Sequence, residues 1–576
     1  MREADTLRSI ALSPFYTVTT TVPGLGPFPY RWNGSVEPIA AGNVALPVYA
    51  TSKDSSVIDD ACVELPASTP NLSGYVTLIR RGTCSFSIQI KNANAKGAKI
   101  ILFYNNGGTW GNIDNVDGYG TAAIVDTASG EAILTALNAG TRFTVSFPQE
   151  VTTKLPNFAD GGLVSKFSSY GPTFDMYFKP AISAPGGRIL STFPVPLGEY
   201  AVLSGTSMAC PHTAGIAALI LKAKGKSAAA GIRDLLQTTS TYLASSLEGA
   251  LPQTLAVGGA GLANVYNALT YSTVVAPGQL LLNDTANWKG KQTFWIKNTS
   301  KKVKTYTLKH IPAGTALSFT PGRPQQNDGP VPLVKNATTV QLSQSKVVVP
   351  PGISLPIIVT IQPPKDIDAS LIPVVSGHIE VATAGEILKV SYLGAASDLK
   401  KARLFDTSGS LLGVPTLLLL DANGKVQKKP IPYTFVGKDH PKLRLRLLFG
   451  TPKISVDLVK ADANIPTTVR ARGLPQSDDW LGGIIEDWFP SLPSKTGTYA
   501  MVPIVGKLGV YAYYARNNKG DNQFYDFDVP GVFVDGTAIP VGSYKVLVRA
   551  LRVGGDAGNQ DHYESWLSPV VNVVEP

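Results

Sequence analysis

The chain has 576 residues, with 51 Lys and Arg against 41 Asp and Glu, which gives a formal net charge of +10. Hydrophobic residues make up 44% and charged residues 16%, so a mainly disordered chain is excluded, and the length predicts roughly three to five domains. No apolar run reaches the roughly 18 residues of a membrane-spanning helix, and no basic block with interleaved aromatics indicates a nucleic-acid module.

The positive charge is uneven along the chain. Residues 1–272 carry 18 basic and 17 acidic side chains, whereas residues 273–576 carry 33 and 24. This excess is compatible with an acidic polymer as partner, or simply with the solvated surface of β-domains. The 55 Gly and 43 Pro favour short strands and turns over long helical bundles.

The first recognisable unit spans residues 40–147. Its stretch YVTLI at 75–79 predicts a strand, residues 88–98 have helical spacing and end near Gly97, and KIILFY at 99–104 predicts a buried strand. Residues 148–272 alternate between strand and helix patterns. Short alternating strands then predict a β-sandwich over 273–395, and a second β-rich domain follows over 396–576 with a strong strand at Val541 to Leu551.

Residues 203–225 read LSGTSMACPHTAGIAALILKAKG and predict a strand-to-loop turn followed by a helix from Thr206. Ser207 therefore lies at a helix N-terminus, where backbone N–H groups are unpaired and carry partial positive charge. Such an environment suits an anionic tetrahedral intermediate, and the N–H of Ser207 itself can donate to the oxyanion.

The pattern G-T-S-M-A-x-P-H in this string resembles the serine motif of the subtilisin-like serine proteases (subtilases). The matching residues are Gly205, Thr206, Ser207, Met208, Ala209, Pro211 and His212. The resemblance implies that Ser207 is the nucleophile and that Gly205, Thr206, Met208, Pro211 and His212 are structural. Residues 167–172, 179–186 and 259–262 resemble further subtilase segments in the family's order.

Two flanking regions also resemble modules of large secreted subtilases. Residues 40–147 are similar to the protease-associated domain through 72–74, 80–86 and 97–98, which implies substrate or partner access and a Cys62–Cys84 disulfide in an oxidising compartment. Residues 273–395 resemble the fibronectin type III-like domain of such proteins. The expected fold is an α/β subtilisin-like remnant with a parallel sheet, formed by 1–39 and 148–272 around the inserted module, followed by all-β sandwiches.

Secretion is expected from this resemblance and from five N-x-S/T triplets, which are glycosylation candidates. They are Asn33, Asn71, Asn283, Asn298 and Asn336. The first residues, MREADTLRSIALSPF, lack a signal-peptide layout, so we expect Met1 not to be the original start. If Cys62 and Cys84 form a disulfide, Cys210 has no partner cysteine in this chain, and we expect it to be a small buried packing residue rather than a reactive thiol.

A serine nucleophile needs a base and an orienting carboxylate, which in subtilases precede the serine as aspartate and then histidine. The five histidines are His212, His310, His378, His440 and His562, and none precedes Ser207. His212 lies five residues further along the same helix, roughly 500° around its axis, and is not expected to act as base. Two D-T-S/A-like strings exist, at Asp126 inside the inserted module and at Asp406 after the serine, and neither has the required order. No oxyanion Asn is assignable.

Three hypotheses follow. The first is a serine endopeptidase represented by an N-terminally truncated sequence that acts on protein or peptide substrates but is inactive alone. The second is a non-catalytic secreted binding protein derived from a subtilase, and the third is a split enzyme completed by another chain. No cofactor is expected. Calcium occurs in the family, but no clustered ligands are present to form a site, and nucleic acid is not expected as a partner.

Overall fold

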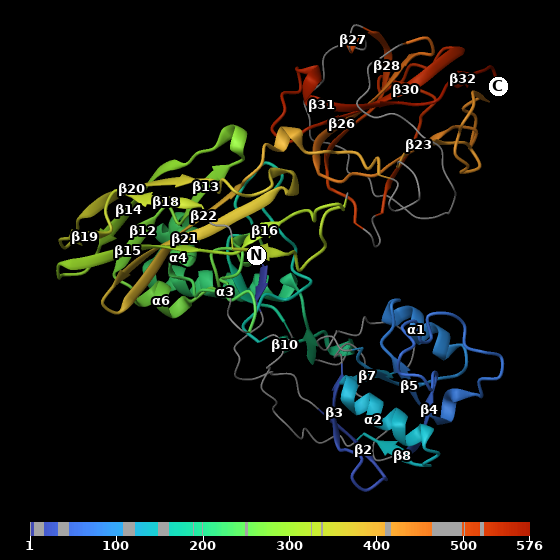
Figure 1. Ribbon diagram of the computed structural model, residues 1–576, viewed down its shortest axis with the longest axis horizontal. Helices are drawn as coiled ribbons and strands as arrows, with labels where there is room; N and C mark the ends of the chain where they lie inside the picture. Colours follow the sequence, from blue (N-terminus) through green and yellow to red (C-terminus); the bar gives the residue numbers. More distant parts are fainter. Residues whose placement is uncertain are drawn as a thin grey trace. The chain divides into compact units, whose positions relative to one another are not determined.

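The computed structural model is shown in Figure 1 and divides into two compact units. The first comprises residues 1–169, 180–253 and 257–271, and the second comprises 170–179, 254–256 and 272–576. The structure describes residues 2–4, 16–32, 45–106, 121–147, 161–187, 189–197, 200–247, 251–323, 325–335, 338–408, 416–463, 498–499, 502–518 and 523–576.

The first unit contains a closed barrel with the strand order β2-β3-β7-β6-β5-β4-β8. Its strands are β2 (Tyr16–Thr20), β3 (Phe28–Trp32), β4 (Leu46–Ala50), β5 (Val76–Arg80), β6 (Ile100–Tyr104), β7 (Thr121–Val125) and β8 (Thr144–Ser146). Strands β4, β5, β6 and β7 run parallel, whereas β2, β3 and β8 close the barrel antiparallel. The barrel includes β2 and β3, which precede residue 40, so it begins earlier in the chain than the unit that was expected to span residues 40–147.

The parallel strands of the barrel are apolar at successive positions because both of their faces are covered. Helix α1 (Phe86–Asn94) packs through Phe86 and Ile90 on one face, and helix α2 (Thr127–Asn138) belongs to the cluster on the other. Helix α2 approaches β6 so closely that a Cβ on Gly130 would lie 2.0 Å from Cβ of Tyr104. The helix expected over 88–98 starts two residues earlier, because Ser85 caps it by accepting from the N–H of Ile88 at 3.4 Å.

The rest of the first unit is a smaller α/β arrangement. The elements are β1 (Arg2–Ala4), β9 (Ser183–Pro185), β10 (Ile189–Thr192), η2 (Val195–Leu197), β11 (Tyr200–Leu203), α3 (Thr206–Lys224), η3 (Lys226–Gly231), α4 (Ile232–Thr239) and α6 (Val265–Thr270). The short helix α5 (Leu255–Gly258) starts in the second unit and ends in the first. Strands β1 and β9 are parallel, and β10 and β11 form an antiparallel hairpin. A core around Ile182, Ile216, Ile220 and Leu236 joins the end of the 180–182 segment to α3 and α4.

The second unit begins with a β-sandwich. One sheet has the order β12-β14-β20-β18 and the other β13-β22-β21-β15-β19, with β16 paired to β21 and β17 paired to β16. The strands are β12 (Thr273–Ala276), β13 (Gln279–Asn283), β14 (Lys291–Asn298), β15 (Lys304–Pro312), β16 (Thr315–Leu317), β17 (Leu333–Val334), β18 (Thr339–Leu342), β19 (Lys346–Val349), β20 (Ser354–Gln362), β21 (Pro373–Thr383) and β22 (Glu386–Ala395). In β14 and β20 buried residues alternate with more exposed ones, so one face of that sheet is solvated.

The final domain is also built from two sheets. Their orders are β23-β25-β29 and β24-β32-β30-β26-β28-β27, with β31 paired to β30. The strands are β23 (Leu417–Leu420), β24 (Ile431–Tyr433), β25 (Lys442–Leu445), β26 (Thr451–Lys460), β27 (Thr498–Tyr499), β28 (Val502–Tyr514), β29 (Tyr525–Asp528), β30 (Gly542–Leu551), β31 (Tyr563–Leu567) and β32 (Val571–Val573). The expected order, an α/β region with parallel strands followed by β-rich domains, is confirmed.

Candidate active site

The sequence motif around Ser207 lies at the junction of β11 and α3. Gly205 is the N-cap residue of α3, its backbone is extended, and its N–H donates to the carbonyl of Gly186 at 2.9 Å. Ser207 is therefore the second residue of a helix that runs from Thr206 to Lys224, and its side chain is exposed. The first N–H groups of a helix of this length are not used by the helix itself, so they can donate to an anion.

Pro211 shapes the first turns of α3 from inside the helix. It has no N–H to give to the carbonyl of Ser207 four residues earlier, and its ring crowds that carbonyl. The N–H groups of Met208 and Ala209 both reach back to the carbonyl of Gly205, at 2.9 and 3.4 Å. The turn that contains Ser207 is therefore hydrogen-bonded to the N-cap residue Gly205, whereas the carbonyl of Ser207 lacks the bond that a residue other than proline would donate from position 211.

No base is placed against Ser207 by the residues that the structure describes. His212 is exposed on the same helix, about 7.5 Å further along the axis and on another side of it. Within the described ranges, Ser207 Oγ forms no hydrogen bond. Among the described residues, this geometry presents a hydroxyl and an N–H that can donate to an oxyanion.

The other four histidines belong to the second unit and have partners there. His310 Nε2 lies 2.8 Å from the Tyr392 hydroxyl, and His378 Nδ1 lies 3.1 Å from Ser391 Oγ. His440 is 3.9 Å from the Asp528 carboxylate, and His562 Nδ1 accepts from the N–H of Asp556 at 2.8 Å. Burial lowers the pKa of His310, and burial together with the charge of Lys389 lowers the pKa of His378 well below its usual value.

The two aspartates in motif-like strings have structural partners. Asp126 ends β7 and is the N-cap of α2, where its Oδ1 accepts from the N–H of Ser129 at 2.7 Å. Asp406 is fully buried and pairs with Arg446, whose Nε lies 3.1 Å from Asp406 Oδ2. Both arrangements are those of stabilising residues, a helix cap and a buried ion pair.

The cysteines separate into a bonded pair and one free thiol. Cys62 and Cys84 form a disulfide that joins the loop before β5 to the start of α1. Gln89 on α1 secures the same loop by donating to the carbonyl of Asp60 at 2.7 Å. Cys210 is free and exposed, so the expectation that it is buried is wrong. It lies on the side of α3 that carries Ser207, Ala214 and Ala218, which are also exposed.

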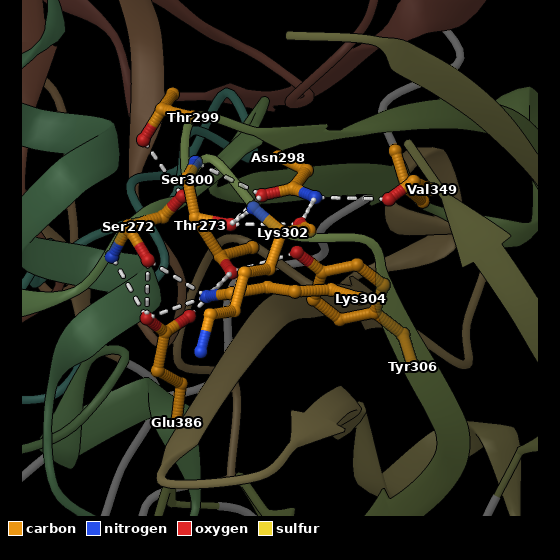
Figure 2. Close-up of polar contacts among 10 residues, drawn as sticks. All are labelled: Ser272, Thr273, Asn298, Thr299, Ser300, Lys302, Lys304, Tyr306, Val349 and Glu386. Carbon is orange, nitrogen blue, oxygen red and sulfur yellow. Dashed lines mark hydrogen bonds and ion pairs between the residues drawn. The ribbon is translucent and has the colours of Figure 1, made fainter. Parts of the chain in front are cut away.

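The glycosylation candidates differ in their surroundings. Asn71 is exposed and uses only its Oδ1, which accepts from the N–H of Ser73 at 3.0 Å. Asn283 is half-buried with its Oδ1 on the N–H of Asp284. Asn298 is fully buried, and its Nδ2 donates to the carbonyls of Lys302 and Val349 at 2.8 and 2.9 Å (Figure 2). Asn298 is therefore not available to a glycan in this fold. Asn33 and Asn336 lie outside the described residues.

A buried polar cluster beyond Ser207 was not identified from the sequence. In Figure 2, Glu386 accepts from the N–H and hydroxyl of Ser272, from Thr273 and from Lys304. Burial would raise the pKa of Glu386, but the hydrogen bonds from Lys304, Thr273 and Ser272 outweigh it and hold that pKa below its usual value. The sequence gives no signal for this cluster, because Glu386 lies 114 residues after Ser272 and the residues form no contiguous motif.

Neither a metal site nor a membrane helix is found in the part of the chain that the structure describes. There, no group of three or more His, Cys, Asp or Glu is arranged to hold a metal ion. No helix among those residues is long and apolar enough to cross a bilayer.

Two models of known protein families match parts of this chain. Residues 31–296 match the model of the subtilase family, and residues 280–393 match that of an Fn3-like domain. The "Minor extracellular protease Vpr" of Bacillus subtilis (strain 168) is 35% identical over 260 residues, which cover 43% of this chain and 31% of that protein. The "C5a peptidase" of Streptococcus pyogenes serotype M1 is 38% identical over 154 residues, 26% of this chain and 12% of that protein.

The matched segments are thus a third or less of each of these relatives. The "PI-type proteinase" of Lactococcus lactis subsp. cremoris is similar as well, at 31% identity over 157 residues, which are 27% of this chain and 8% of that protein. Among solved structures, an "Aminopeptidase from Aneurinibacillus sp. strain AM-1" aligns with 24% of this chain and 33% of its own at 22% identity and a TM-score of 0.17, too low to support an argument about fold.

Proposed function

Since this chain combines a subtilase-family region with an Fn3-like domain, we propose that it serves peptide-bond hydrolysis, with Ser207 as the nucleophile of a secreted serine endopeptidase. The observation that carries the proposal is the place of Ser207 within the G-T-S-M-A-x-P-H motif at the exposed N-terminus of α3. The Ser207 hydroxyl would attack the scissile carbonyl, and the N–H of Ser207 would donate to the oxyanion that forms.

The base and the carboxylate that orients it are, in this proposal, contributed by residues outside this sequence. All five histidines lie at or after residue 212, and four of them have partners in the second unit. Loss of the histidine or the serine in such enzymes lowers turnover by roughly six orders of magnitude. The chain by itself is therefore proposed to be nearly inactive.

The barrel formed by β2 to β8 is proposed to be a protease-associated module that governs access of substrate or partner proteins. Its order of parallel strands with α1 and α2, and the Cys62–Cys84 disulfide, support this assignment and extracellular location. The substrates are proposed to be proteins or peptides, by the chemistry of the nucleophile.

A fluorophosphonate probe tests the proposal. The purified chain is expected to show no labelling above that of its Ser207→Ala variant, since no base activates the hydroxyl. Robust labelling of Ser207 in the chain alone would contradict the missing-base argument.

Coding DNA upstream of Met1 provides the complementary test. An in-frame D-T-G strand and an H-G-T-H motif are expected there, and expression of that longer chain is expected to give probe labelling that Ser207→Ala abolishes. A longer chain that folds and still fails to label would leave the non-catalytic binding protein as the better account. That alternative is favoured by one observation, the lack of any base near Ser207 within the described residues.

A further inference from the structure

The positive charge of the chain is concentrated in one stretch of the Fn3-like sandwich. Residues 285–365 contain 11 Lys and Arg but a single acidic residue, Asp328, so their formal net charge is 11 − 1 = +10. The whole chain also has a net charge of +10, so basic and acidic side chains balance outside this stretch. A partner that is attracted to this charge is anionic, and the sandwich is where the attraction is strongest.

Three of the four strands of the sheet β12-β14-β20-β18 lie in this stretch (Figure 1). Along β14 and β20 every second side chain is buried in the sandwich core, and the side chains between them point outward. None of the four strands contains an acidic residue, and the outward positions of β14 include two exposed lysines, Lys291 and Lys297. The outer face of this sheet is therefore positive and free of carboxylates from its own strands.

An indole ring lies in the middle of this outer face. Trp295 on β14 is 49% exposed, and its cross-strand neighbours are the small residues Ala276 on β12 and Pro356 on β20. Val274 and Ile358, one row away on either side, are 43% and 42% exposed. Single exposed apolar residues are ordinary, whereas a patch across three adjacent strands is typical of a binding surface.

The two lysines lie on either side of Trp295 along β14. At about 3.3 Å per residue, Lys297 lies about 7 Å from Trp295 in one direction, and Lys291 lies about 13 Å away in the other. Among the described residues neither lysine forms an ion pair. Lys289 before the strand and Lys301 after it are exposed as well, so the positive charge continues past both ends of β14.

The backbone of this sheet leaves binding to the side chains. Strand β14 pairs with β12 on one side and with β20 on the other, so its N–H and carbonyl groups are used within the sheet. The edge strands β12 and β18 have four residues each. A peptide that adds a strand would find little free backbone here, whereas a ligand that lies flat on the face meets the indole and the lysines.

The chemistry of the face favours an acidic polysaccharide over other anionic polymers. One side of a sugar ring is made of C–H groups that pack on an indole, and its hydroxyls can bond to Thr293 and Gln341, which are exposed on the same face. Single-stranded nucleic acid is usually bound by several aromatic side chains that stack on successive bases, and this face offers one.

The spacing of the charges narrows the choice further. The two lysines are about 20 Å apart with apolar surface between them, and the four strands contain no arginine whose planar group could bind sulfate or phosphate through two hydrogen bonds. A chain of sugar rings that carry single carboxylates, a polyuronate, matches this sparse charge. A second copy of the same positive face would be repelled.

We propose that the outer face of the sheet β12-β14-β20-β18 binds an acidic polysaccharide of the polyuronate class, with Trp295 packed on a sugar ring and Lys291 and Lys297 paired with its carboxylates. The Fn3-like domain thereby gives the chain affinity for a polyuronate matrix. The inference goes beyond peptide-bond hydrolysis and does not depend on it, because the face contains no residue of the Ser207 motif.

Affinity electrophoresis of the full chain in gels that contain polygalacturonate tests the proposal. The gel is expected to retard the chain, less so as salt is added, whereas neutral dextran has no effect. Trp295→Ala is expected to weaken binding about tenfold, since it removes the stacking surface. Replacing both Lys291 and Lys297 by Gln is expected to weaken binding about three- to tenfold at low salt.

Matched controls separate this face from general attraction to a positive protein. Tyr266→Ala removes an exposed aromatic ring on α6, and replacing both Lys428 and Lys429 by Gln removes the same charge from an exposed segment between β23 and β24. Both controls are expected to bind polygalacturonate as the unaltered chain does. Equal weakening by the two pairs of lysine replacements, or no weakening by Trp295→Ala, would overturn the proposal.

Thr293→Glu tests the same face independently, should circular dichroism show that Trp295→Ala fails to fold. It places a carboxylate between Lys291 and Trp295 and is expected to weaken polygalacturonate binding most at low salt. Tighter Trp295-dependent binding of oligo(dT) would assign the face to nucleic acid, and Trp295-dependent association in sedimentation velocity would assign it to a second copy. Either result, or no retardation by polygalacturonate at low salt, would show the inference to be wrong.

Discussion

Replacing Asn298 by Asp changes one NH₂ group to an oxygen at a buried position of β14. Asn298 makes four contacts: Nδ2 donates to the carbonyls of Lys302 and Val349, and Oδ1 accepts from the N–H and hydroxyl of Ser300. The variant keeps the shape and the acceptor but turns the two donated bonds into repulsions between a carboxylate oxygen and carbonyls. A protonated carboxyl could restore one of the two at most.

The expected cost follows from these contacts. The Lys302 carbonyl keeps the Ser300 hydroxyl as a donor, whereas the buried Val349 carbonyl loses its side-chain donor at a cost of about 1–3 kcal/mol, and an uncompensated buried charge costs about 3–5 kcal/mol. The sandwich should therefore lose about 3 kcal/mol or more. For a domain of roughly 100 residues this lowers Tm by on the order of 10 °C.

Urea dependence of hydrogen exchange in β14 and β20 measures this loss within the full chain. Asn71→Asp is the matched control, because Asn71 is exposed and uses only its Oδ1, which Asp retains. It should be neutral within about 0.5 kcal/mol. In a host that attaches N-glycans, peptide mapping of the folded protein should find Asn71 able to carry a glycan and Asn298 bare. A stable Asn298→Asp sandwich, or a glycan on Asn298 in folded protein, would refute the reasoning.

Three further outcomes are expected. Burial and the charge of Lys389 hold the pKa of His378 well below its usual value, so the native state binds fewer protons than the unfolded state as the pH falls. The sandwich should therefore lose stability from pH 7 to pH 5, and urea titrations at both pH values would measure this loss. Replacing both Cys62 and Cys84 by Ala removes a disulfide between residues 22 positions apart and should lower the free energy of unfolding of the barrel by about 3 kcal/mol. The urea midpoint of the barrel, recorded without reductant, measures this change. Asp406→Asn leaves the buried guanidinium of Arg446 without its carboxylate partner and should destabilise the last domain by about 3–5 kcal/mol, measured by thermal unfolding.

Local sequence patterns predicted the elements whose cause is local. The strand expected at 75–79 is β5 at Val76–Arg80, that at 99–104 is β6 at Ile100–Tyr104, and that at 541–551 is β30 at Gly542–Leu551. Each is an apolar run bounded by turn residues, so its own composition determines it. The early strands β2 and β3 pair with each other, but their membership of the barrel was not predicted, because it depends on pairing with β8 and β7, more than 90 residues away.

The same distinction applies to the candidate site. The helix start at Thr206 and the place of Ser207 in it were predictable, since a glycine cap and a run of small residues specify them locally. Exposure of Cys210 was not, because a small residue in a helix is buried or exposed according to what packs beside it. Burial of Asn298 within an N-x-S triplet was missed for the same reason: the triplet describes the acceptor sequence and not the carbonyls that surround it.

The two sheets of the sandwich differ in how their outer faces are covered. Alternation in β14 and β20 predicts a solvated outer face, and that face is indeed exposed. In β21 and β22 the alternation is lost, since Val374, Ser376 and Leu393 are buried on the side away from the core. A continuous run of buried positions in an antiparallel sheet requires a second cover. Here the cover is 170–179 with 254–256, on either side of the stretch that carries Ser207, so the boundary drawn between a nucleophile domain and an Fn3-like domain divides residues that fold together.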